Sequence, residues 1–537
     1  MRNLTREEKI MNKIVFKMLK SELWWGGSSS WVKVEREGNL ANVQPYDETS
    51  EESFDSIIDG FNQSAPLFLS SCGRYVWSNS PLKATFKKGI VEIEGENVRL
   101  VEAGTCLRDA YLTAMKEHFP FEKKDLPEKF FTTAQYNTWM EFTYNPTQKS
   151  VLEYAHAIVN NGYEPGIFVI DEGWSIHYGT WEFDFVKFPN PKEMIDELHA
   201  LGFTVMLWIV PYVTLDGRNY LELSAPHVSK LKGEVYECKL ARQPNGEVAI
   251  LRWWNGCSGV FNMCEKADRD WLDAKLQHLM RDYGVDGFKF DGGNIGAFSE
   301  GRWITAPPTA TAEALNKAWN DFGARYTYHE YKDTYGRSGK AVIQRIQDRN
   351  HSWKDNGLQT LVPVALLQGI LGYPYICPDM IGGGEWTFNL DPNFKVDEEL
   401  FVRMAQCSAL FPMMQFSWAP WRLIGEEAQA LCLQAAKLHA KFAERIVALV
   451  KETKMKGEPI IRSMEYMYPH CGYERVKDQF LLGDDVLVAP VVEKGARSKR
   501  VYLPKGNWRY CDGNVYMGGI EIVVDAPLER LPYFEKI

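Results

Sequence analysis

The chain has 537 residues, of which 45% are hydrophobic and 25% charged, a composition typical of a globular protein with roughly two to four domains. Its 61 basic and 71 acidic residues give a net charge of −10 without long runs of either sign, which argues against a nucleic-acid surface. Residues 1–25 are interrupted by charges, and no segment reaches the roughly 18 apolar residues of a membrane helix, so we expect a cytoplasmic protein without membrane contact.

Residues 1–125 have the pattern of an all-β domain. Short apolar segments are separated by turn residues, as in residues 64–81, SAPLFLSSCGRYVWSNSP. Apolar and polar side chains alternate through GIVEIEGENVRLVEA within residues 83–104, which is typical of a hairpin. We therefore predict an N-terminal β-sandwich.

Residues 126–452 repeat a strand, a loop and a helix. Near-continuous apolar strands separated by helices predict a parallel sheet that helices cover. No GxGxxG follows the first strand, and the length of the region favours a (β/α)8 barrel over a doubly wound sheet. The predicted strands are 134–142, 166–174, 203–213, 285–291, 340–348, 371–380 and 411–417, and the predicted helices include 145–162, 190–202, 268–284 and 425–451.

Residues 453–537 return to hairpin-like segments such as QFLLGDDVLVAPVV and RSKRVYLPKGNWRY. They predict a C-terminal all-β domain. The predicted fold class is therefore α/β, a (β/α)8 TIM barrel flanked by an N-terminal β-sandwich and a C-terminal β-domain.

The segment VDGFKFDGG, residues 285–293, combines a strand with charged residues. Side chains alternate across a strand, so Gly287, Lys289 and Asp291 share one face and the two phenylalanines share the other. A lysine and an aspartate on one face at the end of a barrel strand lie where the active sites of such barrels are built.

Other predicted strand ends carry further polar or aromatic residues. They are Asp171 and Glu172, Trp208, Arg345 with Asp348, and Asp379, while Trp254 lies in the segment LRWWNG. There is no HxH pattern at these ends and no G-x-S-x-G motif, and the 10 cysteines are scattered without a CxxC pair. We therefore expect no metal, no other cofactor and no serine nucleophile.

Several carboxylates without metal ligands favour glycoside chemistry, in which one acid attacks and a second donates a proton. Lys289 would keep Asp291 ionised, although a structural ion pair between the two is an equally weighted alternative. Apolar neighbours would raise the pKa of Asp348 and suit it to be the acid, but an N-cap is the better alternative for a lone Asp. Asp379 is equally compatible with a turn, and Trp254 with packing.

Three segments together carry a resemblance to a known family. GFKFDGG, RIQDRNHSW and LGYPYICPDMIGGG, in this order and spacing, resemble glycoside hydrolase family 31. That family comprises retaining α-glycosidases on a (β/α)8 barrel with an N-terminal β-sandwich and C-terminal β-domains. The resemblance extends from about residue 130 to the end of the chain and is weaker before it.

The resemblance implies a role for each matching residue. Asp291 matches the nucleophile and Asp348 the general acid/base, while the residues expected to bind the sugar are Asp171, Lys289, Arg345, Asp379, Trp254 and Trp208. Glu172 stands at the same strand end as Asp171 and is included with them, although Glu172 and Gly173 differ here from a mammalian member of the family.

A subgroup of the family that the segments resemble implies terminal α-galactosides, which makes an α-galactosidase acting on a small oligosaccharide the first expectation. An α-glucosidase, a transglycosidase and a carbohydrate-binding protein without catalysis are the alternatives, and a homo-oligomer is left open.

Overall fold

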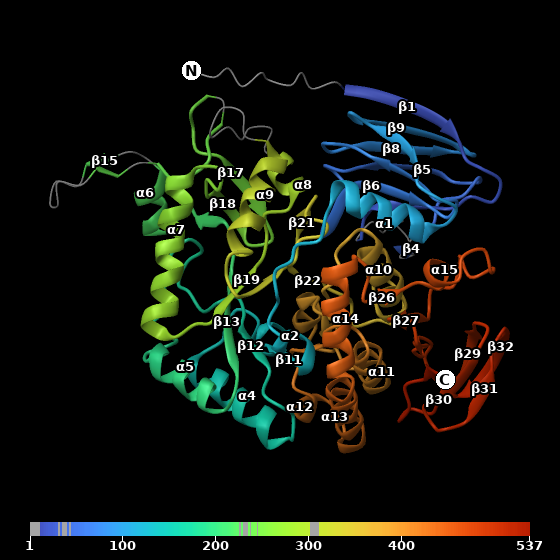
Figure 1. Ribbon diagram of the computed structural model, residues 1–537. Helices are drawn as coiled ribbons and strands as arrows, with labels where there is room; N and C mark the ends of the chain where they lie inside the picture. Colours follow the sequence, from blue (N-terminus) through green and yellow to red (C-terminus); the bar gives the residue numbers. More distant parts are fainter. Residues whose placement is uncertain are drawn as a thin grey trace.

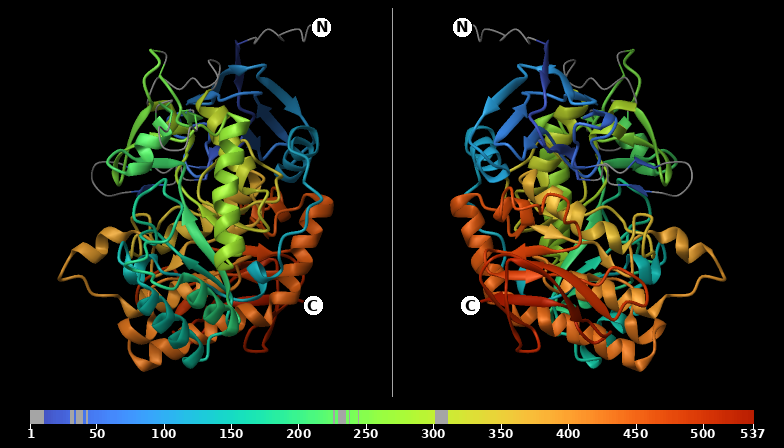
Figure 2. Two further views of the ribbon diagram at one scale, coloured as in Figure 1. Left: turned by 90° about the vertical axis from the view of Figure 1, so that its left-hand side faces the viewer. Right: turned by 90° about the vertical axis from the view of Figure 1, so that its right-hand side faces the viewer.

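The structure is a computed structural model that describes residues 11–29, 33–34, 40–41, 44–224, 227–228, 235–236, 238–243, 245–300 and 311–537. A barrel lies at the centre, the N-terminal strands (blue) lie at one end of it, and the C-terminal strands (red) lie beside the orange helices (Figure 1). In both side views of Figure 2 the N-terminal strands (blue) lie at the top and the C-terminal strands (red) lie in the lower part of the molecule.

The N-terminal region is built from two sheets that share a core. One has the strand order β1-β9-β8-β5 and the other β10-β7-β6-β2, and side chains from both sheets, such as Trp24, Phe54 and Phe86, pack between them. Helix α1, which the sequence pattern did not predict, covers the outer face of the second sheet. The elements are β1 Met11–Lys17, β2 Trp24–Ser28, β5 Glu51–Asp55, β6 Gln63–Ser70, β7 Arg74–Trp77, β8 Lys83–Lys87, β9 Ile90–Glu96, β10 Arg99–Glu102 and α1 Leu107–His118.

The central sheet is parallel and curled into a barrel, as predicted. Its order is β23-β22-β20-β19-β13-β12-β11-β25-β24. Pro378 and Asp379 divide the seventh barrel strand into β23, which pairs with β22, and β24, which pairs with β25, so this strand closes the ring. The strands are β11 Gln135–Asn137, β12 Ile167–Ile170, β13 Thr204–Ile209, β19 Gly287–Phe290, β20 Tyr328–Tyr331, β22 Ile343–Arg345, β23 Ile376–Cys377, β24 Met380–Ile381 and β25 Gln415–Phe416.

One barrel strand, β20, is absent from the sequence prediction. Its residues, YHEY, include a histidine and a glutamate and lack the continuous apolar character of the other strands. Tyr331 packs outward, with its ring 4.8 Å from that of Phe290. Glu330 lies on the inner side, within 3.6 Å of the Arg345 guanidinium. A polar barrel interior therefore hides this strand from a search for apolar runs.

Helices form the outer layer of the barrel. They are α4 Gln148–Asn160, α5 Pro191–Ala200, α7 Lys266–His278, α9 Ala312–Gly323, α10 Leu358–Ile370, α11 Glu398–Ala409, α13 Glu426–Lys441 and α14 Ala443–Lys456. The single helix predicted for 425–451 is thus two helices that meet at Phe442. Among the helices of the described ranges, none combines the length and apolarity needed to cross a membrane.

The C-terminal strands pack on these last helices. They form a sheet of order β26-β27-β28-β33-β30-β31 and a separate β29-β32 pair. The rings of Phe442 and Tyr533 lie 5.4 Å apart, and those of Phe411 and Phe480 lie 5.2 Å apart. The elements are β26 Ile461–Arg462, β27 Phe480–Leu482, β28 Val486–Val488, β29 Ser498–Leu503, β30 Asn507–Tyr510, β31 Val515–Met517, β32 Ile520–Asp525 and β33 Tyr533–Lys536.

The N-terminal sandwich is joined to the barrel at the carboxyl ends of its strands. Strand β21 (Thr334–Tyr335) follows β20 and pairs in parallel with β6 of the sandwich. The Gln63 amide donates hydrogen bonds to the backbone carbonyls of Lys332 (2.7 Å) and Arg345 (3.0 Å). The sandwich therefore contacts the backbone at the ends of β20 and β22, where Lys332 and Arg345 lie.

Candidate active site

Strand β19 places Lys289 and Asp291 as its alternation predicts. Phe288 and Phe290 pack outward, with the Phe290 ring 5.1 Å from that of Trp319 on α9. Lys289 and Asp291 are buried on the opposite, inner face. Gly292 follows with φ of 61° and donates its N–H to Asp291 Oδ1 at 2.7 Å. A residue with a Cβ is strained at this positive φ, so glycine lets the chain turn directly behind the carboxylate.

Asp291 is held in its ionised form. The Trp208 indole N–H donates to Asp291 Oδ2 at 3.0 Å. Burial raises the pKa of Asp291, but the positive charges of Lys332, Lys289 and Arg345 outweigh it and bring the pKa below its usual value. A buried carboxylate that stays ionised at the end of a barrel strand is suited to act as a nucleophile.

Lys289 forms its ion pair with Asp171 across the barrel. The distance from Lys289 Nζ to Asp171 Oδ2 is 2.6 Å, and the same oxygen accepts the Asn137 amide at 2.8 Å. The alternative of a structural Lys289–Asp291 pair is therefore replaced by a pair between β19 and the end of β12. Lys289 acts on Asp291 through its charge.

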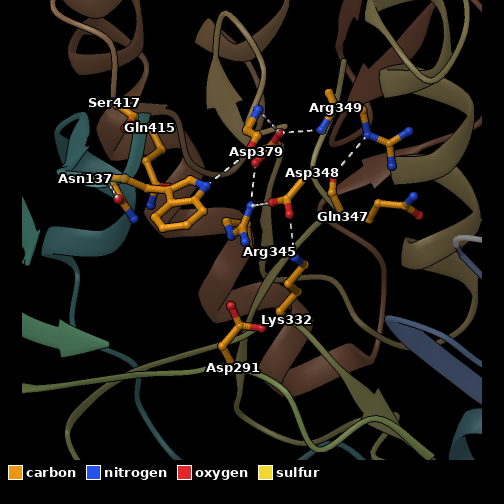
Figure 3. Close-up of polar contacts among 12 residues, drawn as sticks. Asn137, Asp291, Lys332, Arg345, Gln347, Asp348, Arg349, Asp379, Gln415 and Ser417 are labelled. Carbon is orange, nitrogen blue, oxygen red and sulfur yellow. Dashed lines mark hydrogen bonds and ion pairs between the residues drawn. The ribbon is translucent and has the colours of Figure 1, made fainter. Parts of the chain in front are cut away.

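Asp348 lies just beyond β22 between two cations (Figure 3). Its Oδ2 is 2.6 Å from Lys332 Nζ and its Oδ1 is 2.8 Å from Arg345 Nη1. Burial raises the pKa of Asp348, but the two cations lower it well below the usual range. The expected raised pKa of Asp348 is thus wrong for the unliganded protein, because the nearest groups are charged and not apolar. The N-cap of the following helix, α10, is Gly357.

Asp379 anchors the other side of Arg345. Its Oδ1 accepts from Arg345 Nη1 at 2.5 Å, and its Oδ2 accepts the backbone N–H groups of Arg349 (2.8 Å) and Gly384 (3.0 Å). Asp379 has φ of 85°, which is rare for a residue with a side chain and marks local backbone strain. Asp379 therefore orients Arg345 and, through it, Asp348, at the break in the seventh barrel strand.

Glu172 forms a second, neutral part of the site. Its Oε1 accepts hydrogen bonds from the Tyr178 hydroxyl and the Asn255 amide. Burial, joined by the negative charges of Asp171 and Asp291, raises the pKa of Glu172 to about 8. Glu172 is therefore mostly protonated at neutral pH and can offer a hydrogen bond as well as accept one.

Trp254 lies beside this part of the site on the turn between β17 (Ile250–Trp253) and β18 (Gly256–Val260). Its side chain is 46% exposed, while its ring lies 4.7 Å from that of Trp253. The Lys332 Nζ lies 6.0 Å from the centre of the Trp254 ring. An exposed indole face next to the charged centre is suited to pack against the C–H face of a sugar.

The structure adds residues that the sequence did not indicate. Lys332 contacts Asp348, Tyr178 and Asn255 contact Glu172, and Asn137 contacts Asp171. Lys332 lies two residues after the inward-facing Glu330, so the alternation of β20 would have indicated it had that strand been recognised. Within the described ranges, no three His, Cys, Asp or Glu side chains are grouped as metal ligands.

Comparisons with known proteins agree with this architecture. The model of the glycosyl hydrolases family 31 TIM-barrel domain matches residues 125–443, and that of the family 31 C-terminal domain matches residues 457–536. The chain belongs to glycoside hydrolase family 31. Both the TIM barrel and the all-β C-terminal domain of the family are thus present.

Two relatives match about three quarters of this chain. The myogenesis-regulating glycosidase of Mus musculus is 32% identical over 417 residues, which cover 75% of this chain and 56% of that protein. Alpha-glucosidase 2 of Bacillus thermoamyloliquefaciens is 25% identical over 73% of this chain and 50% of that protein. The chain therefore spans about half the length of these two relatives.

A solved structure in family 31 has the same fold over nearly the whole chain. The Flavobacterium johnsoniae dextranase, complexed with glucose, superimposes with a TM-score of 0.79 at 20% identity and covers 98% of this chain and 66% of its own. At this identity the likeness concerns the fold alone.

Proposed function

We propose that the protein is a retaining, exo-acting α-glycosidase that releases terminal α-linked galactose. The observation that carries the proposal is the position of Asp291 and Asp348 at the carboxyl end of the barrel, with Lys332 between them (Figure 3). Asp291 is buried and ionised and has no direct ion pair to a lysine or arginine of the described ranges, and Asp348 lies just beyond a strand end with a quarter of its side chain exposed. Retention would require the two carboxyl groups to lie about 5 to 5.5 Å apart.

In the first step, Asp291 attacks the anomeric carbon, and Asp348, which has to take up a proton once the substrate is bound, gives that proton to the departing glycosidic oxygen. The carbon–oxygen bond to the leaving group breaks, and a β-linked glycosyl ester forms on Asp291. The Trp208 N–H on Asp291 Oδ2 and the Gly292 N–H on Oδ1 would hold the carboxylate in one orientation for the attack.

In the second step, Asp348 accepts a proton from water, whose oxygen attacks the same carbon. The ester bond breaks, its electron pair returns to Asp291, and the sugar leaves with the α configuration. Asp171, Lys289 and Arg345 would bind the ring hydroxyls and oppose the charge that develops on the ring.

Support for a saccharide ligand comes from the exposed Trp254 ring beside Glu172 and from the names of relatives. Support for galactose comes from the subgroup resemblance of segments such as LRWWNG and QFSWAPWR. An α-glucosidase is the second candidate, because a relative with this activity in its name is 25% identical over 73% of the chain. The two sugars differ in whether the 4-hydroxyl is axial or equatorial.

Hydrolysis of p-nitrophenyl α-galactoside and α-glucoside by the purified protein tests the sugar. A higher kcat/KM for the galactoside is expected, and a preference for the glucoside would replace galactose by glucose in the proposal. The anomer released first, followed by proton NMR, tests retention, since an inverting enzyme would release the β-anomer.

The role of Asp291 is tested by Asp291→Asn, which removes the nucleophilic charge and should lower kcat to about 10⁻³ of wild type or less. Asp196→Asn is the matched control, because Asp196 lies on the surface of α5 with 55% of its side chain exposed. Equal turnover by wild type and Asp291→Asn would refute the mechanism. Binding of galactosides without any turnover by wild type would favour a carbohydrate-binding protein.

A further inference from the structure

We propose that Lys332 is a positioning residue of the reaction. Its ammonium group interacts electrostatically with both Asp291 and Asp348, and it acts on Asp348 alone once Asp291 has become an ester. The inference rests on the proposed function and deepens it. It explains how one aspartate serves first as acid and then as base.

The geometry around Lys332 supports this role. Lys332 follows β20, and its Nζ lies 2.6 Å from Asp348 Oδ2, which belongs to the segment after β22. Only 17% of its side chain is exposed. Figure 3 shows the ammonium group between the carboxylates of Asp348 and Asp291, which come from different strands. Asp291 and Asp348 both interact electrostatically with Lys332 and favour its charged form.

The other charged groups near Lys332 have their own partners. Arg345 from β22 is bound to Asp379 as well as to Asp348. Asp333, the next residue along the chain, accepts the backbone N–H of Asn62 from the sandwich at 2.6 Å. The ring of Trp254 approaches from the β17–β18 turn and carries no charge. Lys332 therefore differs from Arg345, because its ion pair is with Asp348 and is not shared with Asp379.

Lys332 and Arg345 differ in how far their charged groups can move. Arg345 is a planar group fixed on Asp379, so it can hold Asp348 in only one geometry. Lys332 has a flexible four-carbon chain and one compact charge, so it can follow Asp348 when a leaving group enters. The Gln63 contact to the Lys332 carbonyl, at 2.7 Å, fixes the backbone from which this movement starts.

The charge of Lys332 has a different effect on Asp348 before and after the attack by Asp291. Before attack, the negative charge of Asp291 opposes the effect of Lys332 on Asp348, which eases protonation of Asp348. After attack, Asp291 is a neutral ester, and Lys332 acts on Asp348 alone. Asp348 has then lost its proton to the leaving oxygen, and the cation stabilises the carboxylate that takes a proton from water.

The pH dependence of Lys332→Met tests the inference. Loss of the cation raises the pKa values of both Asp291 and Asp348, because Lys332 lowers each of them. Both limbs of the kcat/KM profile for an α-galactoside should therefore move to higher pH, by about 1 to 2 units. Lys332→Arg keeps the charge and should keep the limbs within a few tenths of a unit of wild type while kcat falls.

Lys317→Met is the matched control, because Lys317 is a surface lysine of α9 in an ion pair with Glu313. It should leave the profile unchanged. A uniform loss of activity in Lys332→Met with both limbs in place would overturn the inference, as would an equal shift in Lys332→Arg. If Lys332→Met does not fold, Lys332→Gln is measured in the same way.

Failure of the proposed function is distinguishable, because wild type would then hydrolyse neither the α-galactoside nor the α-glucoside. Turnover by wild type with an unshifted profile in the folded Lys332 variant refutes the role of Lys332 alone.

Discussion

Glu172→Gln should change how the stability of the protein depends on pH. Glu172 is buried, and its pKa in the folded protein is about 8 against an ordinary value of 4.5. Above pH 4.5 the unfolded chain releases the proton that the folded protein retains. Stability contributed by the protonated group is therefore fully present below 4.5 and is lost as the pH rises towards 8.

The size of the effect follows from the pKa values. Each pKa unit corresponds to about 1.4 kcal/mol, so titration of Glu172 removes about 3.5 kcal/mol of stability between pH 5 and pH 8. With about 2.1 cal/mol/K of unfolding entropy per residue, a cooperative transition of the whole chain would lose about 3 to 4 °C in Tm from this group. Glutamine does not titrate, and its amide, like the protonated acid, both donates and accepts hydrogen bonds.

Differential scanning calorimetry of wild type and Glu172→Gln at pH 5, 6, 7 and 8 measures the effect. The difference in Tm, variant minus wild type, should rise by about 3 to 4 °C from pH 5 to pH 8. Glu153→Gln, on the surface of α4 with 66% of its side chain exposed, should give a constant difference. A Glu172→Gln difference that is the same at pH 5 and pH 8 would refute the assignment of a proton to Glu172.

Two more variants test the charged centre. Trp208→Phe removes the 3.0 Å hydrogen bond to Asp291, which is worth about 1.5 to 3 kcal/mol for a charged acceptor, so kcat/KM should fall on the order of 10- to 100-fold and the acidic limb of its pH profile should move to higher pH. An unmoved limb would contradict the role of the indole. Lys289→Met leaves the buried Asp171 carboxylate without its cation and should cost about 3 to 5 kcal/mol in urea unfolding, of which Lys289→Met/Asp171→Asn should recover a part. A double variant no more stable than the single one would show that the pair is not coupled.

Within strand β19, the amino-acid sequence was enough to predict the structure. Alternation is a local property of extended backbone, so the placing of Lys289 and Asp291 inward and of Phe288 and Phe290 outward did not depend on the rest of the chain. A parallel barrel with helices outside was also predictable, because most of the βα units carry their own apolar pattern. The three quoted segments likewise indicated family 31, which the family models confirm.

Strand β20 could not be predicted from apolar patterns in the sequence. Its inward-facing Glu330 lies next to the Arg345 guanidinium, and the strand has no continuous apolar run, so hydrophobicity did not reveal it. With the strand, Lys332 was missed, and the environment of Asp348 was taken to be apolar. The tertiary structure instead places two cations on Asp348.

The sequence alone thus determined which face each side chain takes and which strand ends carry acids. Only the tertiary structure decided the pairing of those charges: Lys289 with Asp171, Arg345 with Asp379, and Lys332 with Asp348. The physical reason is that alternation is set by the backbone of one strand, whereas a contact across the barrel depends on the register and tilt of strands far apart in the chain. Protonation follows from these contacts, because burial and neighbouring charges set each pKa.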